Sequence, residues 1–249
     1  MTILIFDIET IPDIEAGRRL YKLQGLSDKE VSNVMFHKRR QEIGADEALR
    51  PHLQRVAAIS TVRLEADSIE LNASSLDERS EEAMVADFYA CIERQAPDLV
   101  CWNGASHAMP VLNYRALVHG IRAPRYWEMS RQNSDRLHHL ELMDVLAGYQ
   151  GGGSAPLAEI ASLLGFPGEL SLGQSRSWDR YLSGELPAIK ARCQYDNLNT
   201  YLVYLRLQLI GGQIDQTDYD EALVRLRESL AQASKVGDAQ LDAFLASWQ

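Results

Sequence analysis

The sequence predicts an α/β fold: a mixed sheet flanked by helices, with a helical extension at the C-terminal end. Apolar segments of strand length are concentrated in the first half of the chain, whereas segments of helical period surround and follow them. The expected strands cover residues 2–12, 56–64, 69–73 and 98–102. The expected helices cover residues 27–41, 80–95, 110–119, 140–148, 156–164 and 187–210, with a helix pair over 217–249.

The N-terminal elements follow from an apolar run and from residues that mark boundaries. Residues 2–11 are rich in Ile, Leu and Phe, which is typical of a buried strand, and Pro12-Asp13 predicts a turn after it. Ser27 and Glu30 have the spacing of a capping box, which predicts the start of a helix.

The middle of the chain alternates between strand and helix signals. Residues 56–64 and 69–73 predict a hairpin because only a short polar segment separates them. Residues 80–95 place four apolar side chains on one helical stripe, and Pro97 ends that helix. Pro110 is at a tolerated position in the first turn of the next helix.

The second half is predominantly helical. Residues 130–136 read as a polar loop, 151–154 as a flexible segment between two helices, and Gly211-Gly212 as the end of a long helix. Two apolar stripes follow, one of Tyr219, Leu223, Leu226 and Leu230 and one of Leu241, Phe244, Leu245 and Trp248. We expect both stripes to pack on the main domain; the alternative is a contact with a second copy or a protein partner.

Composition bounds the class of protein. The chain is 46% hydrophobic and 24% charged, as in ordinary soluble globular proteins, and it has no signal-peptide pattern and no apolar run of membrane-spanning length. Its net charge of −10 argues against sequence-independent coating of nucleic acid, but not against an enzyme that takes a strand end into a metal-containing cleft. The sequence has neither a dinucleotide-binding glycine motif nor a P-loop.

The cysteines indicate a reducing compartment. Cys91, Cys101 and Cys193 are scattered and odd in number, which favours free thiols and a cytoplasmic location. Their spacing along the chain is not that of a zinc motif.

The first strand ends in the most informative pair of residues. Side chains alternate along a strand, so Asp7 and Glu9 emerge side by side on one face. Two neighbouring carboxylates repel each other, and a hard divalent cation with oxygen ligands relieves that repulsion. The alternative is an acidic exit from the strand before the turn at Pro12; the apolar strand favours a metal site.

Three segments together resemble a known family. They are Phe6-Asp7-Ile8-Glu9-Thr10, residues 102–112 at a strand-to-helix junction, and residues 193–206 on the long helix. In this order and spacing they resemble the DEDD-type 3′–5′ exonucleases of the ribonuclease-H-like superfamily. The nearest resemblance is to the stand-alone bacterial group related to the proofreading exonuclease domain of family-B DNA polymerases. The resemblance covers residues 1–210 and implies a ribonuclease-H-like fold.

The resemblance implies a set of acidic residues that holds divalent metal. The family uses four acids to hold two ions during phosphodiester hydrolysis. Asp7 and Glu9 match the first two acids and Asp196 matches the acid of the third motif, so these three are the expected catalytic and metal-ligating residues. The implied cofactor is Mg²⁺ or Mn²⁺, with one or two ions bound.

The chain departs from the family at two positions. The family's aspartate in the second motif is replaced by Ala108, whose methyl group cannot bind a metal. Arg192 stands four residues before Asp196, where the family places a Tyr or general-base group; Tyr195 is rotated about 100° around the helix and is a poor substitute. Losing the second ion predicts a reaction slower by about 10²–10⁴-fold.

Several residues remain candidates for compensating or substrate-binding roles. His107, Glu141 or Asp144 would replace the missing ligand, although a packed or surface position is the more common role for each. Arg192 either competes with metal for the carboxylates or binds the scissile phosphate. Asn103 and Arg115 are further candidates for substrate binding. The alternative for Asn103 is that it shapes the turn after its strand, and the alternative for Arg115 is a solvated position on the surface.

Two functions follow from these expectations. The first is a metal-dependent 3′–5′ exonuclease, weakened by the loss of one ligand, that acts on the 3′ end of single-stranded DNA or RNA. The second is a degenerate exonuclease fold that acts as a nucleic-acid-binding or protein-interaction module. We expect an exonuclease-like domain over residues 1–212 and a C-terminal helical extension over 213–249, with no membrane association.

Overall fold

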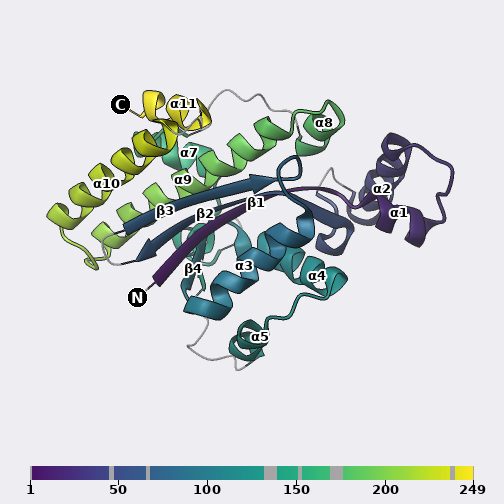
Figure 1. The fold of residues 1–249 in the computed structure, drawn as a ribbon, viewed down its shortest axis with the longest axis horizontal. Helices are drawn as coiled ribbons and strands as arrows, with labels where there is room; N and C mark the ends of the chain where they lie inside the picture. Colours follow the sequence, from purple (N-terminus) through teal and green to yellow (C-terminus); the bar gives the residue numbers. More distant parts are fainter. Residues whose placement is uncertain are drawn as a thin grey trace.

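A five-stranded mixed sheet forms the centre of the protein (Figure 1). The computed structural model describes residues 2–44, 48–65, 68–131, 139–150, 153–168, 176–235 and 239–248. The strands are β1 (Thr2–Pro12), β2 (Gln54–Glu65), β3 (Ser68–Ser75), β4 (Asp98–Cys101) and β5 (His139–Glu141), in the spatial order β3-β2-β1-β4-β5. β2 is antiparallel to both β1 and β3, whereas β4 is parallel to both β1 and β5. This α/β arrangement is consistent with a ribonuclease-H-like fold.

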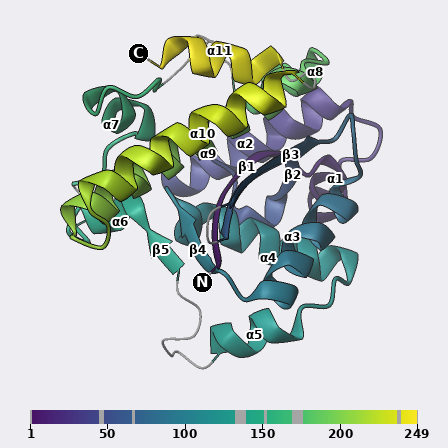
Figure 2. The same cartoon turned by 60° about the vertical axis from the view of Figure 1, so that its left-hand side comes forward.

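Helices cover both faces and one end of the sheet (Figure 2). They are α1 (Ile14–Tyr21), α2 (Asp28–Ile43), α3 (Glu81–Gln95), α4 (Met109–His119), α5 (Pro124–Arg131), α6 (Leu142–Leu146), α7 (Leu157–Leu163), α8 (Ser177–Leu182), α9 (Leu186–Ile210), α10 (Gln216–Lys235) and α11 (Ala239–Ser247). A short 3₁₀ turn, η1, covers Pro51–Leu53, and a single π-helical turn, η2, covers Gly104–Ala108.

Alternate side chains of β1 enter two different hydrophobic cores. Leu4, Phe6 and Ile8 pack with residues of α3 and α4 on one face. Ile5 packs with residues of α9 and of the C-terminal helices on the other face. Because side chains alternate along a strand, Asp7 belongs to the face that α9 covers. The fold therefore directs this carboxylate toward the longest helix.

The two C-terminal stripes pack against the same core. In α10, Tyr219, Leu226 and Leu230 are buried, and in α11 Phe244 is fully buried. These side chains form one continuous hydrophobic cluster with Leu198 and its neighbours on α9. The helices thus add a further layer over the sheet face that carries Asp7 (Figure 2).

Most expected elements occur near their expected positions, including the capping box of Ser27 and Glu30 at the start of α2. The expected helix at 140–148 is wrong at its beginning, because residues 139–141 form the edge strand β5 and only 142–146 are helical. An apolar run of this length does not distinguish a short strand from a helix. The expected loop over 130–136 is wrong at Ser130 and Arg131, which end α5; residues 132–136 lie outside the described residues.

Three helices are absent from the expectations: α1, α5 and α8. Helix α1 was not expected because Pro12-Asp13 predicts a turn. In the structure Asp13 is the N-cap of α1, and its side chain accepts a hydrogen bond from the Ala16 amide at 2.9 Å. The expected segments 66–67 and 151–152 lie outside the described residues. Among the helices described, none is both long enough and apolar enough to cross a membrane.

Candidate metal and nucleic-acid site

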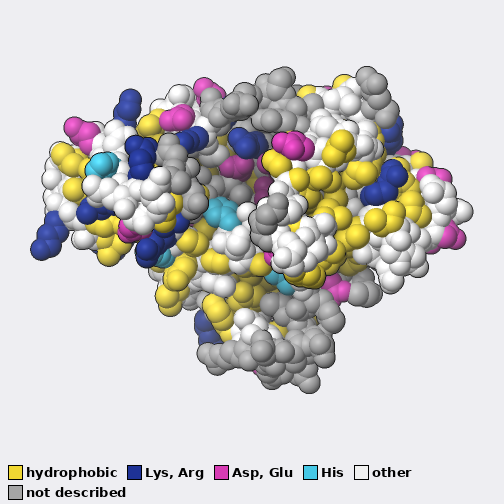
Figure 3. Space-filling model, turned by 180° about the vertical axis from the view of Figure 1, so that it is seen from behind, with side chains coloured by type: hydrophobic (Ala, Val, Ile, Leu, Met, Phe, Trp, Pro, Cys, Tyr) yellow, Lys and Arg dark blue, Asp and Glu magenta, His cyan; other side chains and the backbone are white. Residues whose placement is uncertain are grey.

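A pocket of about 470 Å³ opens where β1 and β4 end beside α9. Its walls also include η2 and the start of α7. The view from behind shows acidic and histidine side chains gathered in a recess between two larger masses of the molecule (Figure 3). The residues that line the pocket include Asp7, Glu9, Thr10, Asn103, His107, Ala108, Arg192, Tyr195 and Asp196.

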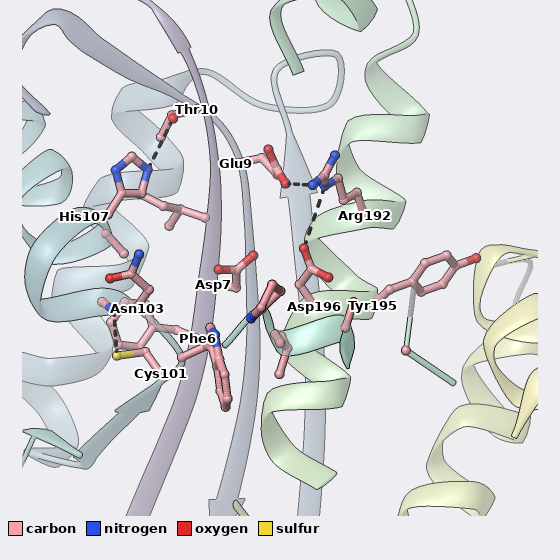
Figure 4. Close-up of a pocket in the computed structure, with 18 residues that line it drawn as sticks. Phe6, Asp7, Glu9, Thr10, Cys101, Asn103, His107, Arg192, Tyr195 and Asp196 are labelled. Carbon is pink, nitrogen blue, oxygen red and sulfur yellow. Dashed lines mark hydrogen bonds and ion pairs between the residues drawn. The ribbon is translucent and has the colours of Figure 1, made fainter. Parts of the chain in front are cut away.

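The register of α9 against the sheet brings the three expected acids to this pocket. The Asn197 side-chain amide donates to the Ser60 hydroxyl at 3.2 Å, and the Cys193 thiol donates to the backbone oxygen of Asp7 at 3.3 Å. These contacts fix the helix turn that carries Asp196 next to the strand segment that carries Asp7 and Glu9. Figure 4 shows the three carboxylates around one space.

Arg192 lies between two of these acids. Its Nε atom is 3.2 Å from Glu9 Oε1 and 3.8 Å from Asp196 Oδ2 (Figure 4). The arginine therefore partly neutralises the acids on the α9 side of the pocket. Its side chain is 37% exposed, so solvent screens these ion pairs. Glu9 also accepts a hydrogen bond from the Ser177 hydroxyl at the start of α8, and no sequence pattern indicated this contact.

The electrostatic environment raises the pKa of both acids from β1. For Asp7 the largest cause is burial, followed by repulsion from Asp196 and from Glu9, and the pKa lies well above its ordinary value. For Glu9 burial also raises the pKa, while Arg192 and the Ser177 hydrogen bond act in the opposite direction. Of these two acids, Asp7 is therefore the less compensated.

The donor chemistry fits one hard divalent cation, which prefers carboxylate oxygens. The three carboxylates are spread apart, however. Among the residues that the structure describes, Asp7, Glu9 and Asp196 do not bring three ligand atoms within 4.8 Å of one another. Mutual repulsion and the Arg192 contact with Glu9 and Asp196 are sufficient physical reasons for this separation. Binding of an ion requires these side chains to turn toward Asp7 and the guanidinium to move away.

The second motif forms the opposite wall. Asn103 accepts a hydrogen bond from the Ser106 hydroxyl and is the residue before η2, so it both shapes the turn and lines the pocket. His107 lies beside Thr10, with 3.5 Å between Nε2 and Oγ1, and burial lowers its pKa, which favours the neutral ring. Ala108 is buried and presents a methyl group to the pocket.

Comparison with protein families identifies the chain. A model of predicted 3′–5′ exonucleases related to the exonuclease domain of PolB matches residues 46–248. The chain belongs to this family. None of the curated proteins matches the chain. The segment that matches this exonuclease-like family includes Asp196 and the second motif but begins after Asp7 and Glu9. Those two acids are candidates because they line the same pocket as Asp196.

Other residues expected at the site of this exonuclease-like protein lie elsewhere. Arg115 is 5% exposed and bonds Asp13 at 2.6 Å and Glu81 at 2.7 Å, so the structure does not bring it to the pocket and its expected surface role is also wrong. Glu141 and Asp144 do not line the pocket. Tyr195 lines it but directs its ring away from the acids, and its hydroxyl donates to the Gln240 backbone oxygen at 2.7 Å (Figure 4).

Proposed function

We propose that the protein is a metal-dependent 3′–5′ exonuclease that hydrolyses phosphodiester bonds at the 3′ end of single-stranded DNA or RNA. The observation that carries this proposal is the meeting of Asp7, Glu9 and Asp196 in one pocket, although about 190 residues separate the first from the last. Partly buried carboxylates that repel one another cost stability, which is typical of a functional site. Membership of the exonuclease-like family supports the same reaction class.

The proposed roles follow from the position of each side chain. Asp7, Glu9 and Asp196 hold one Mg²⁺ or Mn²⁺ ion, which when bound supplies positive charge for activating water and for the developing negative charge on phosphate. Asp7 stands nearest the centre of the group (Figure 4). Once the guanidinium of Arg192 leaves the acids, it contacts the scissile phosphate. Asn103, on the opposite wall, offers its amide to the sugar-phosphate chain.

Activity is proposed to be weaker than that of a two-metal nuclease. Ala108 offers no ligand where the DEDD resemblance implies an aspartate, and no acid among the other lining residues replaces it. Charge stabilisation from one ion instead of two leaves the reaction slower by about 10²–10⁴-fold. His107, which precedes Ala108 in sequence, also lines the pocket and offers a ring nitrogen as a ligand. Such a ligand suits manganese better than magnesium.

The experiment is a length assay with 5′-labelled single-stranded DNA and RNA in Mg²⁺ or Mn²⁺. We expect metal-dependent shortening by the wild type, loss of shortening in Asp7→Ala, and no change in Asp220→Asn, which alters an exposed acid on α10. Ala108→Asp is expected to raise the rate at least tenfold by restoring a ligand. Intact oligonucleotide in every metal, with wild type and Ala108→Asp alike, contradicts the proposal.

A second candidate is a nucleic-acid-binding module without turnover. It is favoured by one observation, the contact of Arg192 with both Glu9 and Asp196, which places a fixed cation where an ion would otherwise bind. This candidate predicts a gel shift with intact oligonucleotide that persists in Asp7→Ala and in the presence of a chelator. The nuclease predicts shortening that the chelator abolishes.

A further inference from the structure

A second group of metal-type ligands lies in the wall of the pocket, where Cys101 is itself a lining residue. Cys101 ends β4, and His139 and Glu141 belong to the neighbouring parallel strand β5. One ligand atom from each residue lies within 4.8 Å of the others, and this is the only group of three found among the described residues. Strand pairing creates the cluster, because Cys101 pairs with Glu141 and Leu99 with His139, which places all three residues at adjacent positions.

We propose that Cys101, His139 and Glu141 bind one thiophilic divalent cation of the zinc type. Thiolate, imidazole and carboxylate are the three ligand classes that zinc uses in proteins. The inference is independent of the proposed nuclease activity, since it involves none of the residues assigned to that reaction.

Of two separations between ligand atoms, one matches a tetrahedral site and the other is shorter. Bonds of about 2.3 Å to sulfur and about 2.0–2.1 Å to nitrogen or oxygen place ligand atoms about 3.6 Å apart. The Cys101 Sγ to Glu141 Oε2 distance is 3.5 Å, which already fits. The Cys101 Sγ to His139 Nε2 distance is 2.8 Å, so the imidazole must retreat by about 0.8 Å when an ion separates the two atoms.

Glu141 supplies an independent sign of a ligand. The residue is only 8% exposed, and its Oε1 atom is buried without a hydrogen-bond partner in the part of the chain that the structure describes. An unsatisfied buried carboxylate oxygen carries a substantial desolvation cost. A hydrogen-bond network of thiol, imidazole and carboxylate leaves that oxygen unpaired, whereas a cation gives the carboxylate a counter-charge.

The backbone around the cluster is arranged for anionic ligands. The Gly104 amide donates to Cys101 Sγ at 3.1 Å, and the Ala105 amide donates to Glu141 Oε2 at 2.5 Å. Donors of this kind stabilise a thiolate and a carboxylate and orient them for metal. Burial lowers the pKa of His139, which keeps the ring neutral and its lone pair available. Burial and the Glu141 charge raise the pKa of the Cys101 thiol well above its ordinary value, so the thiolate forms only together with the metal bond. On binding, the thiol proton passes to solvent as the sulfur–metal bond forms.

Gly104 shows how closely the loop approaches the cluster. A Cβ atom at this position would lie 2.2 Å from Cys101 Sγ and 3.2 Å from His139 Nε2, so only glycine fits. An ion here joins the ends of β4 and β5, and the Gly104 and Ala105 amides connect η2, which carries His107 and Ala108, to two of its ligands. We assign the site a structural role in shaping that wall of the pocket.

The test uses cobalt as a spectroscopic substitute for zinc. Metal-free wild-type protein titrated with Co²⁺ is expected to develop a thiolate-to-cobalt charge-transfer band that saturates at one equivalent and disappears when zinc is added. The band is expected to be absent in Cys101→Ser and preserved in Cys91→Ser and Cys193→Ser. Because Cys101→Ser places a hydroxyl in the core, Glu141→Gln serves as an isosteric second variant, with at least tenfold weaker binding expected.

Several outcomes overturn the proposal. They are the absence of a charge-transfer band in the wild type, a band that persists in Cys101→Ser, a band that is lost in Cys193→Ser, or unchanged affinity in Glu141→Gln. Asp196→Asn separates this site from the acid pocket, because it is expected to leave the cobalt band intact while abolishing oligonucleotide shortening. A failed nuclease assay with an intact cobalt band would therefore overturn only the proposed function.

Discussion

Two groups of carboxylates near the C-terminal end of β1 show opposite electrostatic arrangements: Asp13 and Glu81 form the first, and Asp7, Glu9 and Asp196 form the second. In the core, the Arg115 guanidinium bonds Asp13 with one nitrogen and Glu81 with another, at 2.6 Å and 2.7 Å, and all three side chains are buried. In the pocket, Arg192 is half-exposed and contacts Glu9 and Asp196 through one nitrogen at 3.2 Å and 3.8 Å. Among the described residues, no ion pair involves Asp7.

The difference separates a structural network from a candidate functional site. In the first group each acid has a close, dry counter-charge, so its removal leaves uncompensated buried charge. In the second group, the acids are brought together without sufficient positive charge, and burial together with repulsion from Asp196 and Glu9 raises the pKa of Asp7. Of these two groups, the second keeps its repulsion, and it lies where the proposed function places an ion or substrate.

The largest expected effect comes from breaking the structural network. Arg115→Ala leaves Asp13 and Glu81 buried without their cation and is expected to cost about 3–5 kcal/mol of unfolding free energy. For a chain of this size, about 1 kcal/mol corresponds to about 2–4 °C in melting temperature. Thermal unfolding measures the loss, with exposed Arg122→Ala as the control. An Arg115→Ala variant as stable as that control would remove the contrast between the two groups.

Divalent metal is expected to stabilise the acid pocket by the next largest amount. At 100 times its dissociation constant, Mg²⁺ or Mn²⁺ stabilises the folded protein by about 2.7 kcal/mol. Because the pKa of Asp7 is raised, metal binding displaces a proton and the apparent affinity increases with pH. Calorimetry in two buffers measures the proton release. An equal thermal shift in Asp7→Asn would show that the ion binds elsewhere.

Removing the repulsion itself is expected to stabilise the metal-free protein. A raised pKa means that ionised Asp7 opposes folding. This cost in unfolding free energy is absent below the unfolded-state pKa of 3.8, and it grows as the pH rises from there to the folded-state pKa. Asp7→Asn should therefore melt higher than the wild type at pH 7–8 in chelator, and the advantage should shrink toward pH 4. Melting curves across that range measure it; a lower melting temperature at pH 8 would be inconsistent with repulsion.

The smallest expected effect on stability belongs to Arg192. Arg192→Gln breaks exposed ion pairs and is expected to cost about 0–1 kcal/mol. The matched control is Lys190→Gln on the same helix, which breaks a 2.6 Å ion pair with Glu78 away from the pocket. We expect Mg²⁺ affinity to rise in Arg192→Gln alone, because the competing cation is gone. Unchanged metal affinity with weaker oligonucleotide binding would instead assign Arg192 to phosphate.

Local sequence signals predicted much of the fold. The apolar run of β1, the capping box of α2 and the glycine pair after α9 lie where sequence reasoning expected them. Edge strand β5 and the short helix α8 were missed, because three or six residues carry too little periodicity to separate strand, helix and loop. Both matter for the chemistry: β5 carries His139 and Glu141, and α8 provides the hydroxyl that binds Glu9.

The periods of strand and helix are enough to predict that Asp7 and Glu9 share a face and that Arg192 lies one helical turn from Asp196. Long-range packing brings these two pairs to one pocket and places Arg115 in the core instead. It also placed Cys101 beside His139 and Glu141, although the cysteine spacing predicts no metal site. Such contacts depend on the register between strands and on the packing of α9, and neither is encoded in any short segment.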